Sequence, residues 1–523
     1  MKVKSQHSSK TQLATKKIGF LSIVIFVIGS TLGAGIFFKN KEVLNNNHGS
    51  FILSLVCWGI AILGVLAMGI TLAELSSGSK QNNKEGTIGW VKTFNNNYMY
   101  KVARCFMTWI YSPLSFFFLP YYALLSIQDG VFLACGYTIP WYVIIICSFL
   151  VMIWFAISAG FSVKTAHVQS WIITAVKFFP VVLVVVLGFV IFGQGGNHTP
   201  LWPDNNPDSP YFDPSAKLFT DITPLFGIIA SVPAILFAFD GFYTVSSNTL
   251  EMKEPKKAPL AMAIGLLALS IIDIAITLAM LLGTTDGTVY SITDWLQSKH
   301  LTWLGVTIDV MIGIGVFGIL NGFALFDSFY YGALIKIGEL PLSSKLKKYR
   351  INVGGTIYKT VCAIIAFTLF TIIGIFYLKS SGYDSTEFDD KSQRLYTFVD
   401  TMANWTALLS FGSIAIAQIG ALRNRKTNKV KVQKTKLFVP CAIFSVSLIC
   451  LGGLYIVCEQ IANVFITGLH LMGNTMPILD GIVPTCISLG VLVLFLLVMF
   501  IYPIFEIRHN KRKVSMLVDT SIK

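Results

Sequence analysis

Near the N-terminus the chain reads Ile28-Gly29-Ser30-Thr31-Leu32-Gly33-Ala34-Gly35-Ile36-Phe37. It lies inside the first long apolar segment, residues 18–38, which is long enough to cross a bilayer as a helix. Glycine and small hydroxyl residues fill its middle, and they are poor helix formers. Non-helical backbone persists inside a membrane only where protein buries it or where it lines a cavity. The stretch therefore predicts a helix that is broken near its centre.

A broken helix at this position has two interpretations. The half that follows the break presents backbone N–H groups and the positive end of its dipole, which together favour an anion such as a carboxylate. Alternatively, Gly29 and Gly33 form a small-xxx-small pair that lets two helices pack closely. The stretch alone leaves both interpretations open.

Composition indicates a polytopic membrane protein. The chain has 523 residues, of which 54% are hydrophobic and 13% are charged, whereas about 25% are charged in an average soluble domain. About twelve apolar segments are long enough to span a bilayer. We place them at 18–38, 50–73, 102–127, 141–160, 168–192, 224–250, 260–283, 304–330, 357–378, 395–422, 437–458 and 482–507.

The positive net charge of +14 is read as a topology signal. Lysine and arginine concentrate in the first 17 residues, in every second loop and in the tail, whereas the other loops are acidic. The positive-inside rule then predicts a multi-pass protein of the plasma membrane with both termini cytoplasmic. Nucleic-acid binding is a poor explanation of this charge, because the basic residues are spread over loops that face one side.

A second interrupted segment predicts an internal repeat. It reads Leu236-Phe237-Ala238-Phe239-Asp240-Gly241-Phe242-Tyr243-Thr244-Val245, with a carboxylate and a glycine where a spanning helix should have neither. It begins outside, whereas the first span begins inside, so a repeat of five spans must be inverted. Paired interrupted helices at matching positions of two halves indicate a transport site at the membrane midplane. The second break therefore favours the transport interpretation of the first.

The expected organisation has seven parts. They are a basic cytoplasmic tail (1–17), a first five-helix repeat (18–193), an extracellular loop (194–223), a second five-helix repeat (224–422), a basic cytoplasmic loop (423–436), two additional helices (437–507) and a cytoplasmic tail (508–523).

Three motifs resemble the amino acid–polyamine–organocation transporters. Residues 29–37 are similar to that family's first-helix signature, residues 237–242 with 251–257 to its sixth helix and the following loop, and Leu320-Asn321-Gly322 with Ser328, Gly338 and Pro341 to its eighth helix and exit loop. The resemblance implies an all-α fold of the leucine-transporter type, with five plus five inverted helices and two extra ones. The chain departs from the family in having Tyr243 where a Glu is frequent and Phe329 where an Arg is frequent, whereas the basic residue Lys336 is present.

The expected substrate site lies between the two broken helices. N–H groups around Ser30, Thr31 and Gly33 would meet an α-carboxylate, and carbonyl groups freed at Ile28 and at 237–240 would meet an α-ammonium group. The resemblance makes Phe237 the bulky residue that closes the site from outside, and Tyr111 is expected to wall the pocket. The expected substrate-binding residues are Ile28, Ser30, Thr31, Gly33, Gly35, Phe237, Ala238, Phe239, Asp240 and Tyr111.

Lys177 is the basic residue that lies well inside a predicted span. Ionisable groups in spans are costly and are candidates for function. By resemblance, Lys177 stands where sodium-coupled relatives hold a cation, so we expect it to replace Na⁺, either as a fixed charge or as a group that exchanges a proton. The alternative is that its ammonium group reaches back to the membrane surface.

Five aspartates also lie within predicted spans. Asp309, Asp327 and Asp400 fall near helix ends, where water or snorkelling can reach them, so we favour a solvated or capping carboxylate over a functional one. Asp273 is either a proton-titrating group or a helix-pairing group, and Asp240 either faces the substrate or accepts hydrogen bonds from its own helix turn; the sequence leaves both choices open.

These features predict a secondary active transporter of amino acids that works by alternating access without Na⁺, by proton coupling or by exchange. Neutral or cationic amino acids are expected, because Asp240 would repel an acidic side chain. The alternatives are a transporter-like amino acid receptor or sensor, and a carrier of polyamines or other organic cations. An enzyme is disfavoured because the chain has no P-loop, HExxH or GxSxG motif. The expected partners are an amino acid, the bilayer and, as a candidate, protons; no cofactor, metal or nucleic acid is expected, and the sequence does not indicate the oligomeric state.

Overall fold

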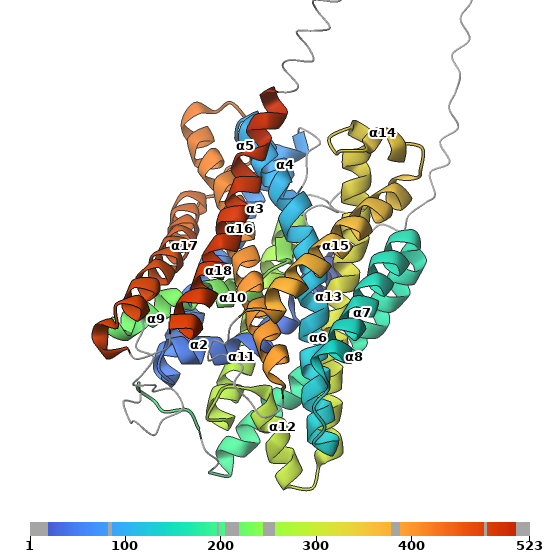
Figure 1. Ribbon diagram of the computed structural model, residues 1–523. Coiled ribbons are helices and arrows are strands. Elements are labelled where there is room, and N and C mark those ends of the chain that lie inside the picture. The colour runs from blue at the N-terminus through green and yellow to red at the C-terminus, as the bar shows by residue number, and fades with distance from the viewer. Residues whose placement is uncertain are drawn as a thin grey trace, which may run out of the picture.

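The structure is a computed structural model that describes residues 19–81, 86–195, 198–203, 219–243, 257–377, 388–474 and 478–508. In these ranges every regular element is a helix (Figure 1). Long helices run roughly along one axis, with the short helix α14 (Ser343–Leu346) at one end of the bundle and α12 (Val289–Ser298) at the other (Figure 1). We refer to these as the α14 end and the α12 end. The predicted all-α fold is confirmed.

Within the described ranges, ten helical segments are long and apolar enough to cross a membrane. They are α3 (Phe51–Gln81), the continuous segment Asn97–Cys135, α7 (Trp141–Phe161), α8 (Val163–Gly193), α11 (Ala258–Gly283), α13 (Thr302–Ile337), α15 (Ile351–Ile375), α16 (Asp390–Thr427), α17 (Phe438–Gly468) and α18 (Ile478–Phe500). With two interrupted segments, described next, they account for the twelve predicted spans. The remaining short helices are α4 (Gly86–Phe94), η2 (Phe219–Ile222) and η6 (Leu471–Gly473).

The first span is broken where the sequence predicts. Helix α1 (Phe20–Thr31) ends before Leu32 and Gly33, and α2 (Ala34–Asn46) begins directly after them. Leu32 adopts an extended conformation with φ −62° and ψ 116°, and Gly33 is also extended at φ 177°. These two residues therefore separate two short helices within one span.

The sixth span is interrupted as well. Its first half consists of α9 (Pro224–Ala230) and α10 (Val232–Ala238), which meet at Ser231. After Ala238 the chain turns, and Gly241 has a φ of 100°, a value that glycine adopts without strain. The rest of the predicted span, residues 244–250, lies outside the described residues.

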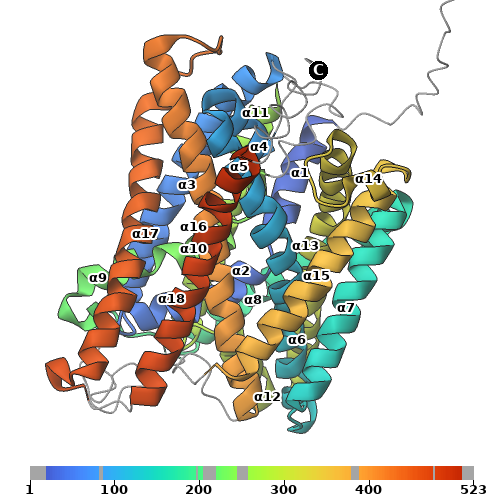
Figure 2. The same cartoon turned by 45° about the horizontal axis from the view of Figure 1, so that its top comes forward.

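The two interrupted segments pack antiparallel to each other; α10 lies inside the bundle, whereas α9 lies at its edge (Figure 2). A Cβ atom added at Gly35 would lie 2.3 Å from the Cα of Ala238, and one added at Gly227 would lie 2.0 Å from the carbonyl oxygen of Asn46. Both distances are too short for any side chain, so each glycine is required for close contact between α2 and the α9–α10 segment. Gly35 was predicted to bind substrate, and the structure instead places it at this helix contact.

The third span contains two prolines yet forms one continuous segment. It comprises α5 (Asn97–Cys105), a π-helical turn at Phe106–Tyr111 and α6 (Ser112–Cys135), with Pro120 inside α6. In the most apolar part of this segment 94% of the residues are buried, so neighbouring helices surround it. Prolines are tolerated in spanning helices because such neighbours can satisfy the freed backbone groups. The π-helical turn is of interest because such turns are frequent at functional sites.

Helices α17 and α7 lie at opposite edges of the bundle (Figure 2). Apolar side chains on the outer faces of α7 and α8 are exposed, among them Leu150, Trp171 and Val182. Exposed apolar surface of this kind fits a lipid environment, where it carries no hydration cost.

Candidate functional site

The break in the first span is occupied by the side chain of Lys177. Its ammonium group, on α8, donates hydrogen bonds to the carbonyl oxygens of Gly29 and Leu32, the second at 3.0 Å. The residue is only 4% exposed. In an unbroken helix the Gly29 carbonyl would accept a bond from the N–H four residues on. The lysine takes the place of that missing donor, and its side chain does not extend to the membrane surface.

Room for Lys177 comes from a glycine on the facing helix. A Cβ atom at Gly315 of α13 would lie 3.2 Å from the Cβ of Lys177. The same face of α13 covers the break itself, since a Cβ atom at Gly33 would lie 2.2 Å from the Cδ1 atom of Ile319. A Cβ atom at Gly29 would meet nothing within 4 Å. Side-chain space at the break is therefore available beside Gly29 and is filled beside Gly33.

Two groups of the first break that were predicted to meet the substrate form hydrogen bonds within α1 instead. The Ile28 carbonyl, predicted to be free, accepts a bond of 2.8 Å from the N–H of Leu32. The Thr31 hydroxyl donates to the Val27 carbonyl at 2.9 Å and is 3% exposed. The side chain of Ser30 lies outside the described residues. Helix α1 therefore continues to Thr31, further than expected, and the chain leaves the helical conformation at Leu32.

Asp240 in the second break is held by two tyrosines. The hydroxyl of Tyr111 donates to one carboxylate oxygen at 2.9 Å, and the hydroxyl of Tyr243 donates to the other at 2.6 Å. The two tyrosine hydroxyls also contact each other at 3.0 Å, and Tyr243 bonds to Ser410 of α16. Both tyrosine side chains are buried. The Asp240 carboxylate therefore binds phenol groups, a partner that neither sequence interpretation included.

Tyr243 is a residue that the sequence interpretation missed. It was noted as a departure from the family pattern, and the structure shows that it is a hydrogen-bond partner of Asp240. The signal in the sequence is the spacing, because residues three apart lie on the same face of a helical turn. Tyr111 is found at this cluster, at the end of the π-helical turn.

At the turn after α10, backbone carbonyl groups accept hydrogen bonds from N–H groups of the same turn. The N–H groups of Phe239 and Asp240 bond to the carbonyls of Leu236 and Phe237, each at 3.1 Å. The Phe239 side chain is fully buried, with its ring 6.5 Å from that of Trp58. Phe239 was predicted to bind substrate, and the structure places its side chain in the core. The Ala238 backbone lies against Gly35, as described above.

Phe237 lies between the breaks and a charged cluster nearer the α12 end. Its ring is 5.7 Å from the ring of Phe118 and 5.5 Å from that of Tyr122. The ammonium group of Lys39 lies 5.3 Å from the Phe237 ring centroid, which is within reach of a cation–π interaction. The Phe237 ring is thus in contact with aromatic rings of the third span and with the ammonium group of Lys39.

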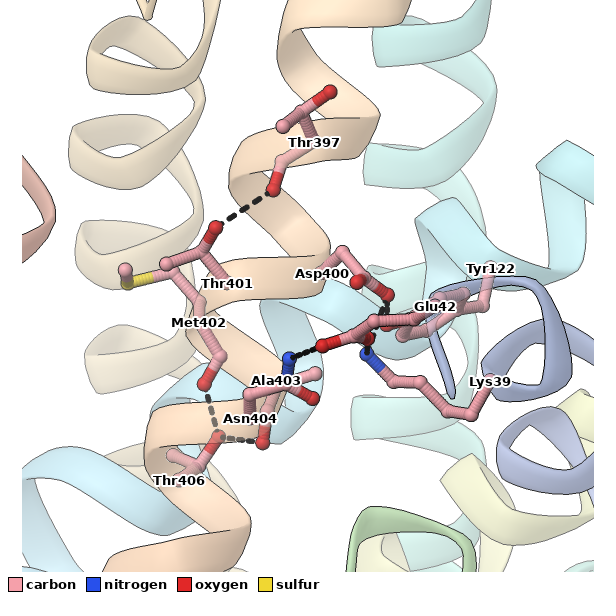
Figure 3. A network of polar contacts seen from close by, with 10 residues as sticks. All are labelled: Lys39, Glu42, Tyr122, Thr397, Asp400, Thr401, Met402, Ala403, Asn404 and Thr406. Atoms are coloured by element: carbon pink, nitrogen blue, oxygen red, sulfur yellow. Dashed lines mark hydrogen bonds and ion pairs between the residues drawn. The ribbon is translucent and has the colours of Figure 1, made fainter. Parts of the chain in front are cut away.

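The charged cluster joins α2, α6 and α16 (Figure 3). Lys39 forms ion pairs with Glu42 at 2.9 Å and with Asp400 at 2.6 Å. Asp400 also accepts a bond of 2.6 Å from Tyr122, and Glu42 accepts one of 2.7 Å from Asn404. The Asp400 side chain is 15% exposed, and it also pairs with a fully buried lysine. Lys39 was missed because the predicted first span ended at residue 38, whereas the break lets α2 continue to Asn46.

A second group of buried charges lies between α6, α13 and α15. The Ser112 hydroxyl donates to Asp327 at 2.5 Å. Lys359 donates to the Ala324 carbonyl at 2.6 Å and to the Ser328 hydroxyl at 2.8 Å. Asp309, Asp327 and Lys359 are each 1% exposed. The prediction that water reaches Asp309 and Asp327 is therefore wrong, because the helices extend past the predicted limits and neighbours cover these positions.

Asp273 is also 1% exposed, and no described residue donates a hydrogen bond to its Oδ2 atom. This burial is compatible with both predicted roles of Asp273, a proton-titrating group and a helix-pairing group. Among the described residues, no group of three or more His, Cys, Asp or Glu is placed to hold a metal ion.

Comparisons with known proteins agree on the class of the chain. Residues 18–511 match the sequence model of the amino acid permease family. An uncharacterised protein of Mycoplasma pneumoniae is 33% identical over 96% of both chains. The serine/threonine exchanger SteT of Bacillus subtilis is 27% identical over 63% of this chain and 70% of its own.

The fold is similar to that of a solved structure. The crystal structure of MhsT in complex with L-phenylalanine superposes with a TM-score of 0.51 at 13% identity, covering 86% of this chain and all of MhsT. This similarity concerns the fold alone. It confirms the predicted leucine-transporter-type architecture.

Proposed function

The chain belongs to the amino acid permease family, and from this premise we propose that it carries amino acids across the plasma membrane by alternating access and without Na⁺. The family consists of transporters, and the chain is a multi-pass membrane protein with an amino acid as its substrate class. The mechanism, the coupling and the orientation are our inferences from the geometry.

The observation that carries this proposal is the contact of the Lys177 ammonium group with the Gly29 and Leu32 carbonyls. These oxygens, left without helical partners by the break, are the kind of ligand that a hard cation takes. A buried ammonium group already supplies the positive charge there. A second cation a few Å away would be strongly repelled in a poorly screened interior. We therefore infer that Lys177 replaces a bound Na⁺.

The two breaks suit the two charges of an amino acid. Helix α2 starts at Ala34, so its first N–H groups and its dipole favour the substrate carboxylate. The Asp240 carboxylate, polarised by Tyr111 and Tyr243, lies in the opposite break and favours the ammonium group. An acidic side chain is disfavoured by Asp240. Because the relative SteT is a serine/threonine exchanger, serine and threonine are the first substrates to test.

The proposed orientation places the α14 end in the cytoplasm. Helix α14 and the residues beside it contain Lys345, Lys347 and Lys348. A second basic segment, 423–436, includes the last turn of α16 and the residues after it. Asp286 and Asp294 lie at or next to α12. This distribution of charge supports cytoplasmic termini by the positive-inside rule.

Reconstitution into liposomes tests the proposal. Labelled serine and threonine should accumulate in liposomes preloaded with unlabelled amino acid or with an imposed proton gradient, and replacing Na⁺ with choline should leave the rate unchanged. Binding without uptake would favour the receptor alternative, and uptake of putrescine in preference to amino acids would favour the organic-cation alternative. Uptake that saturates with Na⁺ would contradict the role of Lys177.

A further inference from the structure

Two consecutive residues of the third span hold two different carboxylates. The Tyr111 hydroxyl binds Asp240 at 2.9 Å, and the Ser112 hydroxyl binds Asp327 at 2.5 Å. Tyr111 is the last residue of the π-helical turn, and Ser112 is the first of α6. A shift of this turn would therefore act on both carboxylates at once. Asp327 is thereby connected to the proposed substrate region without belonging to it.

Asp327 is accompanied by a second buried charge, Lys359. The Lys359 ammonium group donates to Ala324 and Ser328 and lies 5.2 Å from the ring centroid of Phe116. Its charge acts on Asp327 electrostatically, although its hydrogen bonds go to other groups. Since a buried charge is costly without an opposite charge nearby, the two residues form a compensating pair.

Only one of the two Asp327 carboxylate oxygens accepts a hydrogen bond from a described residue. Its Oδ2 atom accepts from Ser112, whereas no described residue donates to the buried Oδ1 atom. An ionised carboxylate normally uses both oxygens as acceptors when it is buried. The Oδ1 atom is therefore the position at which a proton can be bound.

The helices are closely packed around Ser328, the hydroxyl partner of Lys359. A Cβ atom at Gly355 would lie 1.9 Å from the Ser328 carbonyl oxygen, and one at Gly160 would lie 2.2 Å from the Thr356 hydroxyl oxygen. These contacts bring α7, α13 and α15 together around Ser328. The Lys359 charge also disfavours a metal cation beside Asp327.

Hydroxyl groups and charges continue from Asp327 to the α14 end. The titratable groups that face it are Lys359 from α15 and Tyr330 and Tyr331 from α13 itself. The third span contributes Ser112, and α7 has no charged residue. Further out, Thr108 lies 3.0 Å from the Tyr330 hydroxyl, and Glu339 accepts bonds of 2.7 Å from Tyr100 and 2.8 Å from Arg104.

We propose that Asp327, paired with Lys359, is the proton-binding site that couples proton movement to amino acid transport in this chain. In each cycle the Asp327 carboxylate binds one proton at Oδ1 and becomes a neutral carboxyl, then releases the proton toward the α14 end and is ionised again. Lys359 interacts electrostatically with the Asp327 carboxylate and thereby influences how tightly that carboxylate binds its proton. The proposal rests on the proposed function and adds the residue that carries the coupling.

Transport and proton movement are measured together in liposomes that enclose a pH-sensitive dye. An inward proton gradient should accelerate serine uptake by the wild type, and serine addition should acidify the interior. Asp327→Asn keeps the shape and the bond to Ser112 but cannot titrate. This variant should retain serine exchange at symmetric pH within about twofold of wild type and lose both proton-dependent signals.

A second variant covers the case in which a lone buried lysine prevents folding. Asp327→Asn combined with Lys359→Gln removes both charges and leaves no uncompensated one. It should show the same exchange without proton dependence. Asp309→Asn is the matched control, because Asp309 is equally buried on the same helix at a distance from this pair; it should keep the gradient response.

Three results separate the two proposals. A gradient response that survives in both Asp327 variants would overturn the inference. Serine uptake by the wild type that ignores the proton gradient would also overturn it, while leaving the proposed transport intact. No uptake or exchange of any amino acid by the wild type would contradict the proposed function itself.

Discussion

The Lys177 ammonium group donates a hydrogen bond of 3.0 Å to the Leu32 carbonyl oxygen, inside the break of the first span. The same group binds the Gly29 carbonyl, so one cation holds both sides of the opened helical turn. The side chain of Lys177 thus supplies hydrogen-bond donors to two backbone oxygens at the position where the first span is unwound.

Lys177→Ala should abolish amino acid uptake. The substitution leaves the Gly29 and Leu32 carbonyls without a donor in a buried position, at a cost of about 1–3 kcal/mol for each group. Uptake of labelled serine into liposomes measures the effect, and circular dichroism checks the helix content. Lys164→Ala is the control, since Lys164 is exposed on the same helix and should be dispensable. Normal uptake by Lys177→Ala would show that the break does not depend on the lysine.

Gly35→Ala should destabilise the protein. Its Cβ atom would overlap the Ala238 backbone at 2.3 Å, and overpacking of this kind costs about 1–3 kcal/mol or more. Thermal unfolding of the detergent-purified protein measures the loss. Gly412→Ala on α16 is the matched control, because its Cβ atom meets nothing within 4 Å and alanine favours the helix. Equal stability of the two variants would refute the close contact between α2 and α10.

Tyr243→Phe should weaken the binding of substrate. The change removes the 2.6 Å bond to Asp240 and the bond to Ser410 while the ring is retained. A hydrogen bond to a charged group contributes about 1.5–3 kcal/mol, so we expect a rise in KM of at least tenfold or a matching loss of kcat/KM. Tyr349→Phe, at an exposed position near α14, should behave as wild type. An unchanged kcat/KM in Tyr243→Phe would remove Asp240 and its tyrosines from the binding step.

Glu339 should make stability sensitive to acid. Burial alone raises the pKa of this carboxyl, but hydrogen bonds from Arg104 and Tyr100 and the Arg104 charge lower the pKa below its ordinary value. A group whose folded-state pKa is depressed stabilises the protein above its unfolded pKa, and this stabilisation is lost as pH falls through the folded value. The unfolding temperature of the wild type should therefore drop below about pH 4.

The comparison variant for this test is Glu339→Gln. It should be less stable than wild type at pH 7, and the difference should shrink as the pH falls toward 3. A difference that stays constant over this range would show that Glu339 does not contribute through its ionised form.

Apolar runs and glycine positions determined the class, the spans and both breaks. Segments such as 102–127 and 395–422 are predictable because the bilayer imposes a length and a polarity on each helix separately. The break at Leu32 and Gly33 is predictable for the same local reason, since glycine-rich backbone does not hold a helix unaided. These properties belong to short windows of sequence and need no knowledge of neighbours.

The partners of the buried charges were decided by the tertiary structure. Lys39 and Asp400 are 361 positions apart and form an ion pair, and Lys359 and Asp327 come from different helices. The sequence placed Asp309 and Asp327 near helix ends with access to water, yet both are buried, because whether water reaches a side chain depends on the helices that pack over it. Likewise Gly35 and Phe239 lie within the predicted motifs, but their roles follow from contacts with Ala238 and Trp58. Burial and charge pairing are properties of the assembled bundle, because each requires groups from distant segments to occupy the same small volume.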